Sequence, residues 1–392
     1  MGFGQVLLLK VSLMSATSQL KDINICYVPK NFSLEQGTDL ITYTSFKPFI
    51  LPIKTLAVGA LGAGLAVALN LPAAPLLGAM LATAALGWGG VRLSLPDRFR
   101  DAGLLVIGLS LGSGFTRDML GDAGEYAFSL GLLSISIVVS MLASSWLLTR
   151  YWRQSATTAL LASAPGTLSL ALAMAAEGKG DSTTVICLQS MRLLMLAAFL
   201  PLLVSFMGAD GSGGANADQV LSWTMLGLLT LLGILLGLVF GRLHFPAPFL
   251  LGGMVVSAIA HMAEWAHGLP PAMVIFLGFA LVGAASGARF SNIALHDLVK
   301  NLGAAFASVA VAAAVSALFA FAASAASGLP LAQIWVAYAP GGVEAMAAIG
   351  LALGFDPAFV ALHHLFRISL LIAILPLFVK IATNAGQKNA GP

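Results

Sequence analysis

Apolar segments follow one another through most of this sequence, and only short polar stretches separate them. A membrane-spanning helix needs about 20 mostly apolar residues. Six segments approach or exceed that length: 51–69, 126–149, 183–207, 220–241, 302–326 and 357–379. Four shorter ones are 73–90, 102–116, 247–263 and 272–288. Only 9% of the 392 residues are charged, whereas a soluble domain has about 25%. We therefore predict an all-α integral membrane protein.

Two further apolar segments, 155–178 and 331–353, are interrupted in the middle by proline and glycine. Proline removes a helical hydrogen bond and clashes with the preceding turn. Backbone groups freed at membrane depth are tolerated only where protein or a wet cavity satisfies them. We therefore expect a substrate-binding site at these breaks, formed by Pro165, Gly166, Pro340, Gly341 and Gly342.

The second half of the sequence repeats the first. Five residues recur 175 positions further along: Pro165, Gly166, Asp181, Arg192 and Pro201 match Pro340, Gly341, Asp356, Arg367 and Pro376. We predict two membrane repeats joined by a glycine-rich linker, with a tail after them: 49–207, 208–219, 220–381 and 382–392. Residues 1–48 have a different composition and are expected to form a loosely ordered extension, unless translation starts further along the sequence.

The positions of lysine and arginine favour repeats of inverted topology. If each broken segment enters the membrane and returns on the same side, thirteen of these residues lie on the cytoplasmic side and only Arg117 lies outside. If all twelve segments cross, the split is nine against five. Cytoplasmic loops are enriched in Lys and Arg. We therefore expect about ten transmembrane helices plus two re-entrant broken hairpins, with both termini in the cytoplasm.

Two arginines lie in the middle of long apolar segments, where a charge costs at least a few kcal/mol. Gln189 precedes Arg192 by three residues, and His364 precedes Arg367 by three. Each arginine therefore has a polar neighbour on its own helix face. Guanidinium groups match carboxylates, so one interpretation is a pair of arginines that binds an anionic substrate. The other is an internal salt bridge between the halves.

Three carboxylates lie close to the breaks. Glu344 follows the second break directly, whereas the first repeat has Ser169 at that place. Glu344 is a candidate for binding substrate, a proton or a cation, or for balancing the charge of an arginine. Asp181 and Asp356 lie just before the next apolar segments, and we expect them to cap the N-termini of those helices.

Several of these motifs resemble those of the membrane AbrB family, also described as AbrB duplication proteins and labelled ammonia monooxygenase. The resemblance covers about residues 50–380, and it rests on Leu77-Gly78-Ala79-Met80, Ala162-Ser163-Ala164-Pro165-Gly166 and Ala339-Pro340-Gly341-Gly342-Val343-Glu344-Ala345-Met346. It implies a role in the regulation of gene expression and a bacterial inner-membrane location. The monooxygenase label implies copper or iron. The six histidines are dispersed, so we expect no metal site, no cofactor and no such enzyme activity.

The broken segments and inverted repeats together are typical of secondary transporters. We therefore expect a transporter of a small organic anion, with alternating access at the repeat interface. The expected partners are the lipid bilayer, a small-molecule substrate and a coupling proton or sodium ion, and a homo-oligomer remains open. The net charge of +3 includes no basic stripe, so we expect no nucleic-acid binding.

Overall fold

The computed structural model describes residues 47–115, 123–207 and 219–389. The predicted extension 1–48 and the linker 208–219 therefore lie almost wholly outside the described residues. The chain divides into two units, Met1–Lys47 and Pro48–Pro392, and the second contains nearly all of the described residues. Every regular element in the described part is a helix, so the prediction of an all-α protein is confirmed.

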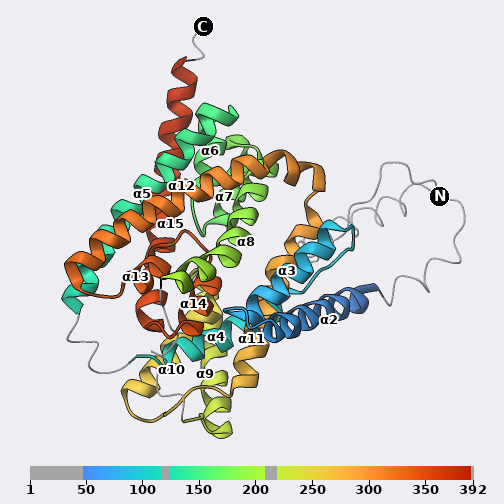
Figure 1. Cartoon of the computed structure of the whole chain (residues 1–392), viewed down its shortest axis with the longest axis vertical. Coiled ribbons are helices and arrows are strands. Elements are labelled where there is room, and N and C mark those ends of the chain that lie inside the picture. The colour runs from blue at the N-terminus through green and yellow to red at the C-terminus, as the bar shows by residue number, and fades with distance from the viewer. Residues whose placement is uncertain (1–46, 116–122, 208–218, 390–392) are drawn as a thin grey trace, which may run out of the picture. The chain divides into compact units, whose positions relative to one another are not determined.

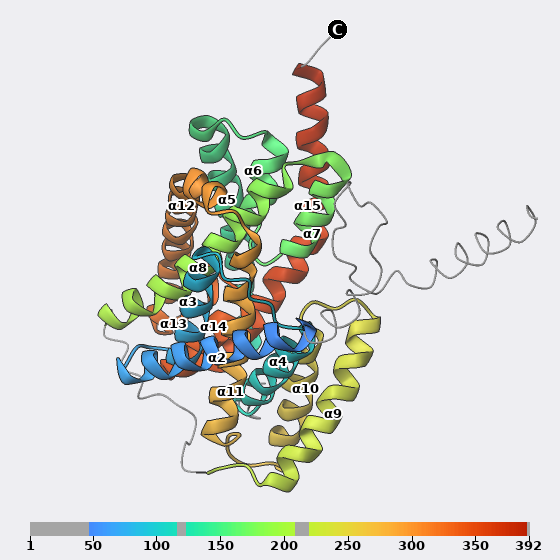
Figure 2. The same ribbon diagram turned by 90° about the vertical axis from the view of Figure 1, so that its right-hand side faces the viewer.

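The helices match the predicted apolar segments closely (Figures 1 and 2). In chain order they are α2 (Lys47–Ala68), α3 (Ala74–Trp88), α4 (Asp97–Gly112), α5 (Ala123–Trp152), α6 (Ala156–Ser163), α7 (Leu168–Met174), η2 (Ala175–Lys179), α8 (Ser182–Phe206), α9 (Trp223–Arg242), α10 (Pro248–Met262), α11 (Ala272–Ala288), η3 (Arg289–Asn292), α12 (Leu295–Ser327), α13 (Leu331–Tyr338), α14 (Val343–Ala352) and α15 (Pro357–Asn389). Among the described helices, seven are long and apolar enough to cross a membrane. The chain is thus a multi-pass membrane protein, and the number of ten spans stays a prediction.

One set of helices, which we term the glycine group, consists of α2, α3, α4, α9, α10 and α11. Within it α4 packs on α10, and α11 packs on α3. Gly108 and Gly112 of α4 lie directly against the backbone of α10. Gly283 and Gly287 of α11 lie directly against the backbone of α3. The two glycine pairs occupy matching positions in the two halves of the sequence, and small residues of this spacing let helix backbones approach closely.

The remaining helices, α5 to α8 and α12 to α15, form the hairpin group. Here α5 packs along α12, and α8 and α13 also pack on α12. Figures 1 and 2 show that α15 runs toward the end of the picture marked C, whereas α8 runs the opposite way. The two helices that match in sequence therefore point in opposite directions.

Each broken segment folds as two short helices and doubles back on itself. The backbone N–H of Asp181, after the first segment, donates to the hydroxyl of Thr158 near its start, at 3.0 Å. The backbone N–H of Asp356 donates to the side-chain oxygen of Gln333 at 3.1 Å. These two bonds join matching positions. A continuous helix of about 24 residues would instead separate its ends by about 36 Å.

Candidate functional site

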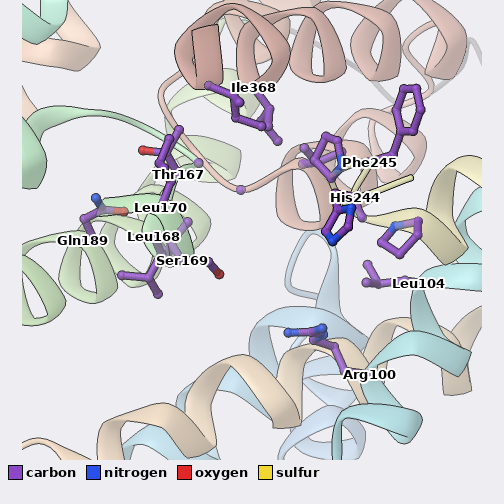
Figure 3. Close-up of a pocket in the computed structure, with 18 of the residues that line it drawn as sticks. Arg100, Leu104, Thr167, Leu168, Ser169, Leu170, Gln189, His244, Phe245 and Ile368 are labelled. Carbon is purple, nitrogen blue, oxygen red and sulfur yellow. The ribbon is translucent and has the colours of Figure 1, made fainter. Parts of the chain in front are cut away.

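A cavity of about 430 Å³ lies between the glycine group and the hairpin group (Figure 3). Figure 3 shows Thr167, Ser169 and Gln189 on one side and Arg100 and His244 on the other. The described residues that line the cavity are Arg100, Leu104, Gly166, Thr167, Leu168, Ser169, Leu170, Gln189, Arg192, Leu193, His244, Phe245, Pro246, Ala247, Pro248, Arg289, Gly342, Val343, Ile368 and Ile372. Both breaks therefore contribute to one site.

The backbone at the first break requires glycine. Gly166 has a φ of +78°, which L-residues with a side chain rarely adopt. A Cβ atom there would also lie 3.2 Å from Ile368 and 3.8 Å from the guanidinium of Arg367, both on α15. The break in the first half is thus in contact with the helix that carries the second arginine.

Arg192 uses its guanidinium group to bind the backbone at the end of α6. It donates to the carbonyl oxygens of Ala162, Ser163 and Ala164 at 3.1–3.2 Å. The last carbonyls of a helix have no partner within it, so the arginine satisfies groups that the break has left free. The side chain is 5% exposed, and its Nε atom is buried without a partner.

Arg367 does the same for the second break. Its guanidinium donates to the carbonyl oxygens of Ala339 and Gly341, and the residue is 1% exposed. The polar neighbours also match. Gln189 donates to the carbonyl of Leu161 at 2.7 Å, and the Nε2 atom of His364 lies 3.0 Å from the carbonyl of Val336.

The predicted site residues divide between the cavity wall and the layer behind it. The wall includes Gly166, Gln189, Arg192 and Gly342. The other predicted site residues whose side chains the structure describes are not among the lining residues: Pro165, Pro340, Gly341, His364 and Arg367. The bonds given above for each arginine join parts of one half. Both interpretations of the arginines, an anion site and a salt bridge between the halves, stay predictions.

The sequence pattern did not point to three cationic or titratable residues of the wall. Arg100 lies in α4, where it pairs with Asp101 at 3.1 Å and approaches Asp97 at 3.8 Å. Arg289 comes directly after α11, and His244 joins α9 to α10. In the sequence, all three lie between apolar segments, where charged residues are expected to belong to cytoplasmic loops. One signal was available for Arg100, because it precedes the apolar Leu104 by one helical turn and so shares its helix face.

The charged lining residues of the cavity that the structure describes are arginines, one of which, Arg100, is paired with Asp101. Three arginines line the cavity, and no aspartate or glutamate is among the lining residues that the structure describes. The rest of the wall is largely apolar. A cleft with one sign of charge and walls of low dielectric focuses its field on ligands of opposite charge.

Comparison with known proteins gives the family. The family model described as "Transition state regulatory protein AbrB" matches residues 86–383. The chain belongs to the AbrB family. This confirms the resemblance drawn from the motifs. "Uncharacterized protein YhjN" of Bacillus subtilis (strain 168) is 28% identical over 362 residues, which cover 85% of this chain and 89% of that protein. "Putative regulator AbrB" of Escherichia coli (strain K12) is 24% identical, covering 82% and 94% of the two chains.

Near the breaks of this AbrB-family chain, the structure describes the side chains of Asp181 and Asp356 but not that of Glu344. Glu344 lies in the first turn of α14, but its side chain is outside the described part. Asp181 accepts hydrogen bonds from the backbone N–H groups of Thr183 and Thr184. Asp356 accepts from those of Ala358 and Phe359. Both carboxylates thus have the geometry of a helix N-cap.

The two caps have opposite pKa shifts. The hydroxyl of Thr184 donates to Asp181 and is the main reason that the pKa of this carboxyl lies below its usual value. Burial raises the pKa of Asp356, although its backbone hydrogen bonds act in the opposite direction. In this AbrB-family chain the matched aspartates therefore respond differently to acid.

Proposed function

We propose that this AbrB-family protein is a secondary transporter that binds a small organic anion in the cavity between the helix groups. The observation that carries the proposal is the set of three arginines, Arg100, Arg192 and Arg289, around one cavity whose described wall has no carboxylate. Charge-assisted hydrogen bonds to a carboxylate would supply affinity. The apolar part of the wall would contact the body of the substrate.

We further propose that the repeats are inverted in a bacterial inner membrane, with ten spans, two re-entrant hairpins and both termini in the cytoplasm. Three observations support this topology. The ends of each broken segment lie within a hydrogen bond of each other. The matching helices α8 and α15 run in opposite directions. The matching glycine pairs each pack on a helix of the other half.

Alternating access would then be a movement of one helix group against the other. The cavity lies at their boundary, so such a movement would change its wall. The glycine group contributes Arg100 and the start of α10, and Arg289 follows its helix α11 directly. The hairpin group contributes the two breaks and Arg192. A substrate would therefore bind to both groups at once, and its release would require them to separate. A gradient of protons or sodium ions would drive the cycle.

Binding and uptake together test this proposal. The purified protein is screened for thermal stabilisation by organic carboxylates, and each stabilising compound is then tested for uptake into proteoliposomes. Arg289→Gln should raise KM for uptake about tenfold or more, as expected for the loss of one charged contact. Arg242→Gln is the matched control, because Arg242 is exposed at the end of α9 and outside the described wall. Unchanged KM in Arg289→Gln would refute the anion site.

A second candidate function comes from the names of the relatives. The family description and the E. coli relative both refer to regulation. A membrane protein with this cavity could alter gene expression indirectly, through the level of the compound that it binds. This version predicts changed transcription after deletion of the gene, with no measurable flux in proteoliposomes. Flux through the purified protein would favour the transporter.

We also propose that the chain is not a monooxygenase. In the described residues, no group of three or more His, Cys, Asp or Glu side chains is close enough to hold a metal ion. The proposal is tested by elemental analysis of protein purified from cells supplied with copper and iron. Either metal at one equivalent per chain would contradict it.

A further inference from the structure

A buried histidine in the hairpin group belongs to a hydrogen-bond network that the anion site does not use. His363 of α15 is fully buried. Its Nδ1 atom lies 2.7 Å from the carbonyl of Phe359, and its Nε2 atom lies 2.8 Å from the hydroxyl of Ser129 on α5. That hydroxyl lies 3.1 Å from the hydroxyl of Tyr338 on α13, which donates to the carbonyl of Ser129. The network joins three helices from both halves.

The network has room for one additional proton. A carbonyl can only accept, so Nδ1 carries a hydrogen and Nε2 accepts from the Ser129 hydroxyl when His363 is neutral. If Nε2 binds a proton, it can donate to Ser129. The Ser129 hydroxyl then turns to donate to Tyr338, which continues to donate to the Ser129 carbonyl. Every buried donor keeps an acceptor in both states, so protonation leaves no unsatisfied buried donor in this network. The burial of the charge itself still opposes protonation.

Aromatic rings would also stabilise the charged form. The ring centroid of Phe359 lies 3.9 Å from that of His363, and the ring of Tyr338 stacks on His363 at 6.0 Å. A cation over the face of an aromatic ring is attracted by the ring's quadrupole, and more strongly where water is excluded.

The adjacent histidine lacks these properties. The Nε2 atom of His364 lies by the carbonyl of Val336, and its Nδ1 atom is buried without a partner. A second proton there would create an unsatisfied donor. The first half also shows that this position needs no titratable group, since Gln189 makes the matching bond. The first half has Leu188 at the place of His363, so the proton site is particular to the second half.

We propose that His363 is a proton-binding site that couples pH to the shape of the anion cavity; the coupling role rests on the transport function proposed above. Arg367 lies one helical turn after His363 and binds the carbonyls of the second break. Ile368, next to it, lines the cavity and lies 3.2 Å from the position that a Cβ atom of Gly166 in the first break would occupy. A charge gained at His363 would repel the guanidinium and shift the helix that supports both breaks.

The titratable and charged groups around this site come from three helices. They are Tyr126 on α5, Tyr338 on α13, and Asp356, His364 and Arg367 at or within α15; the Glu344 side chain lies outside the described part. Asp356 stands at the start of α15, where the hydroxyl of Tyr126 lies 3.5 Å from its carboxylate. The ring of Tyr126 packs on Phe359, which contacts His363. Tyr126 and Phe359 therefore connect the carboxylate of Asp356, at the start of α15, with His363.

Thiol labelling tests the coupling without a substrate. Ser169→Cys is made in a background of Cys26→Ser and Cys187→Ala, because Ser169 is exposed and lines the cavity. The introduced thiol is labelled with a membrane-impermeant maleimide between about pH 3.5 and about pH 8, a range that includes the usual titration of histidine and the lower pH at which a buried one takes up a proton. Each rate is divided by that of the SDS-unfolded protein at the same pH, which removes the titration of the thiol itself.

The normalised rate should change at least about threefold with a single-site profile, and His363→Asn and His363→Gln should each remove the change. Asn keeps a donor for the carbonyl of Phe359, and Gln keeps a polar group near Ser129. If one of the two variants does not elute as folded protein, the other is used in its place. His364→Gln and His244→Gln should keep the pH response. A response that survives in the His363 variants, or that is lost in either of the other two, would overturn the proposal. A rate independent of pH in the parent protein would do so too.

Tyr338→Phe provides a readout that a merely structural role of His363 would not change. It removes the acceptor that the Ser129 hydroxyl needs when His363 is protonated. The midpoint of the labelling profile should therefore move to lower pH by about half to one unit, the effect of one buried hydrogen bond. An unmoved midpoint would contradict the network. Because no labelling experiment uses an anion, failure of the proton site and failure of anion transport are distinguishable.

Discussion

Gln189 and His364 occupy matching positions and bind matching backbone carbonyls. A neutral amide and an imidazole thus fulfil one structural task in the two halves. The task is to satisfy a carbonyl near the end of the short helix that precedes each break. This relationship turns the sequence repeat into a set of paired mutational tests.

His364→Gln should be tolerated, because the amide can donate to the carbonyl of Val336 as Gln189 does to that of Leu161. His364→Leu leaves that carbonyl buried without its side-chain donor and should cost about 1–3 kcal/mol. The melting temperature in detergent measures the difference, which should amount to several degrees. Equal loss in both variants would show that the bond contributes nothing.

Arg192→Lys should destabilise the protein although it keeps the charge. A lysine presents a single point of contact and cannot span the carbonyls of Ala162, Ser163 and Ala164 as the planar guanidinium does. We expect a loss of at least about 2 kcal/mol in the free energy of unfolding, because buried acceptors lose their donors. SDS titration monitored by circular dichroism measures it. Arg150→Lys, near the end of α5 and exposed, should behave as the unmodified protein.

Arg367 has a separate test in transport. If it only supports the second break, Arg367→Lys should lower stability and transport together. A second substitution that stabilises the protein elsewhere should then restore both. If it also contributes to anion binding, KM for uptake stays raised after stability is restored. Unchanged uptake of every accepted substrate by Arg367→Ala would exclude any role at the site.

Gly166→Ala should destabilise the first break by about 1–3 kcal/mol, because its φ of +78° is unfavourable for alanine and the methyl group would press on Ile368. Gly131→Ala is the matched control. Gly131 has no atom within 4 Å of the added methyl group and lies within a helix, so this change should be neutral or slightly stabilising. Thermal unfolding of the two variants measures the contrast, and equal effects would contradict it.

The matched caps predict opposite responses to acid. The pKa of Asp181 is lowered in the folded state, so its contribution to stability is present above the unfolded-state value of 3.8 and is lost as the pH falls below it. The pKa of Asp356 is raised, so its charged form is disfavoured in the folded state at neutral pH. Asp181→Asn should therefore cost more stability at pH 7 than Asp356→Asn. Thermal unfolding at that pH provides the comparison, and the reverse order would contradict it.

Much of this architecture could be predicted from the sequence because the constraints are local or repeated. Apolar length indicates helices, and Pro165 and Pro340 mark breaks that a helix cannot continue through. The partners of Arg192 and Arg367 could not be predicted, since the carbonyls that they bind lie 26 to 30 residues away in the sequence and carry no side-chain signal. Two of the three cavity arginines were missed for another reason. Arg100 and Arg289 lie at helix ends, where charge is also expected to mark a loop, and only the packing of α4 and α11 decides between the two.

The arginine bonds have a mechanical consequence. Each guanidinium binds a break to the long helix that comes after it in the same half, so in the proposed transport cycle these parts would move together. The boundary of that movement would lie between these parts and the closely packed helices α3, α4, α10 and α11. A ligand that contacts both Arg192 and Arg289 would hold the two sides of that boundary together.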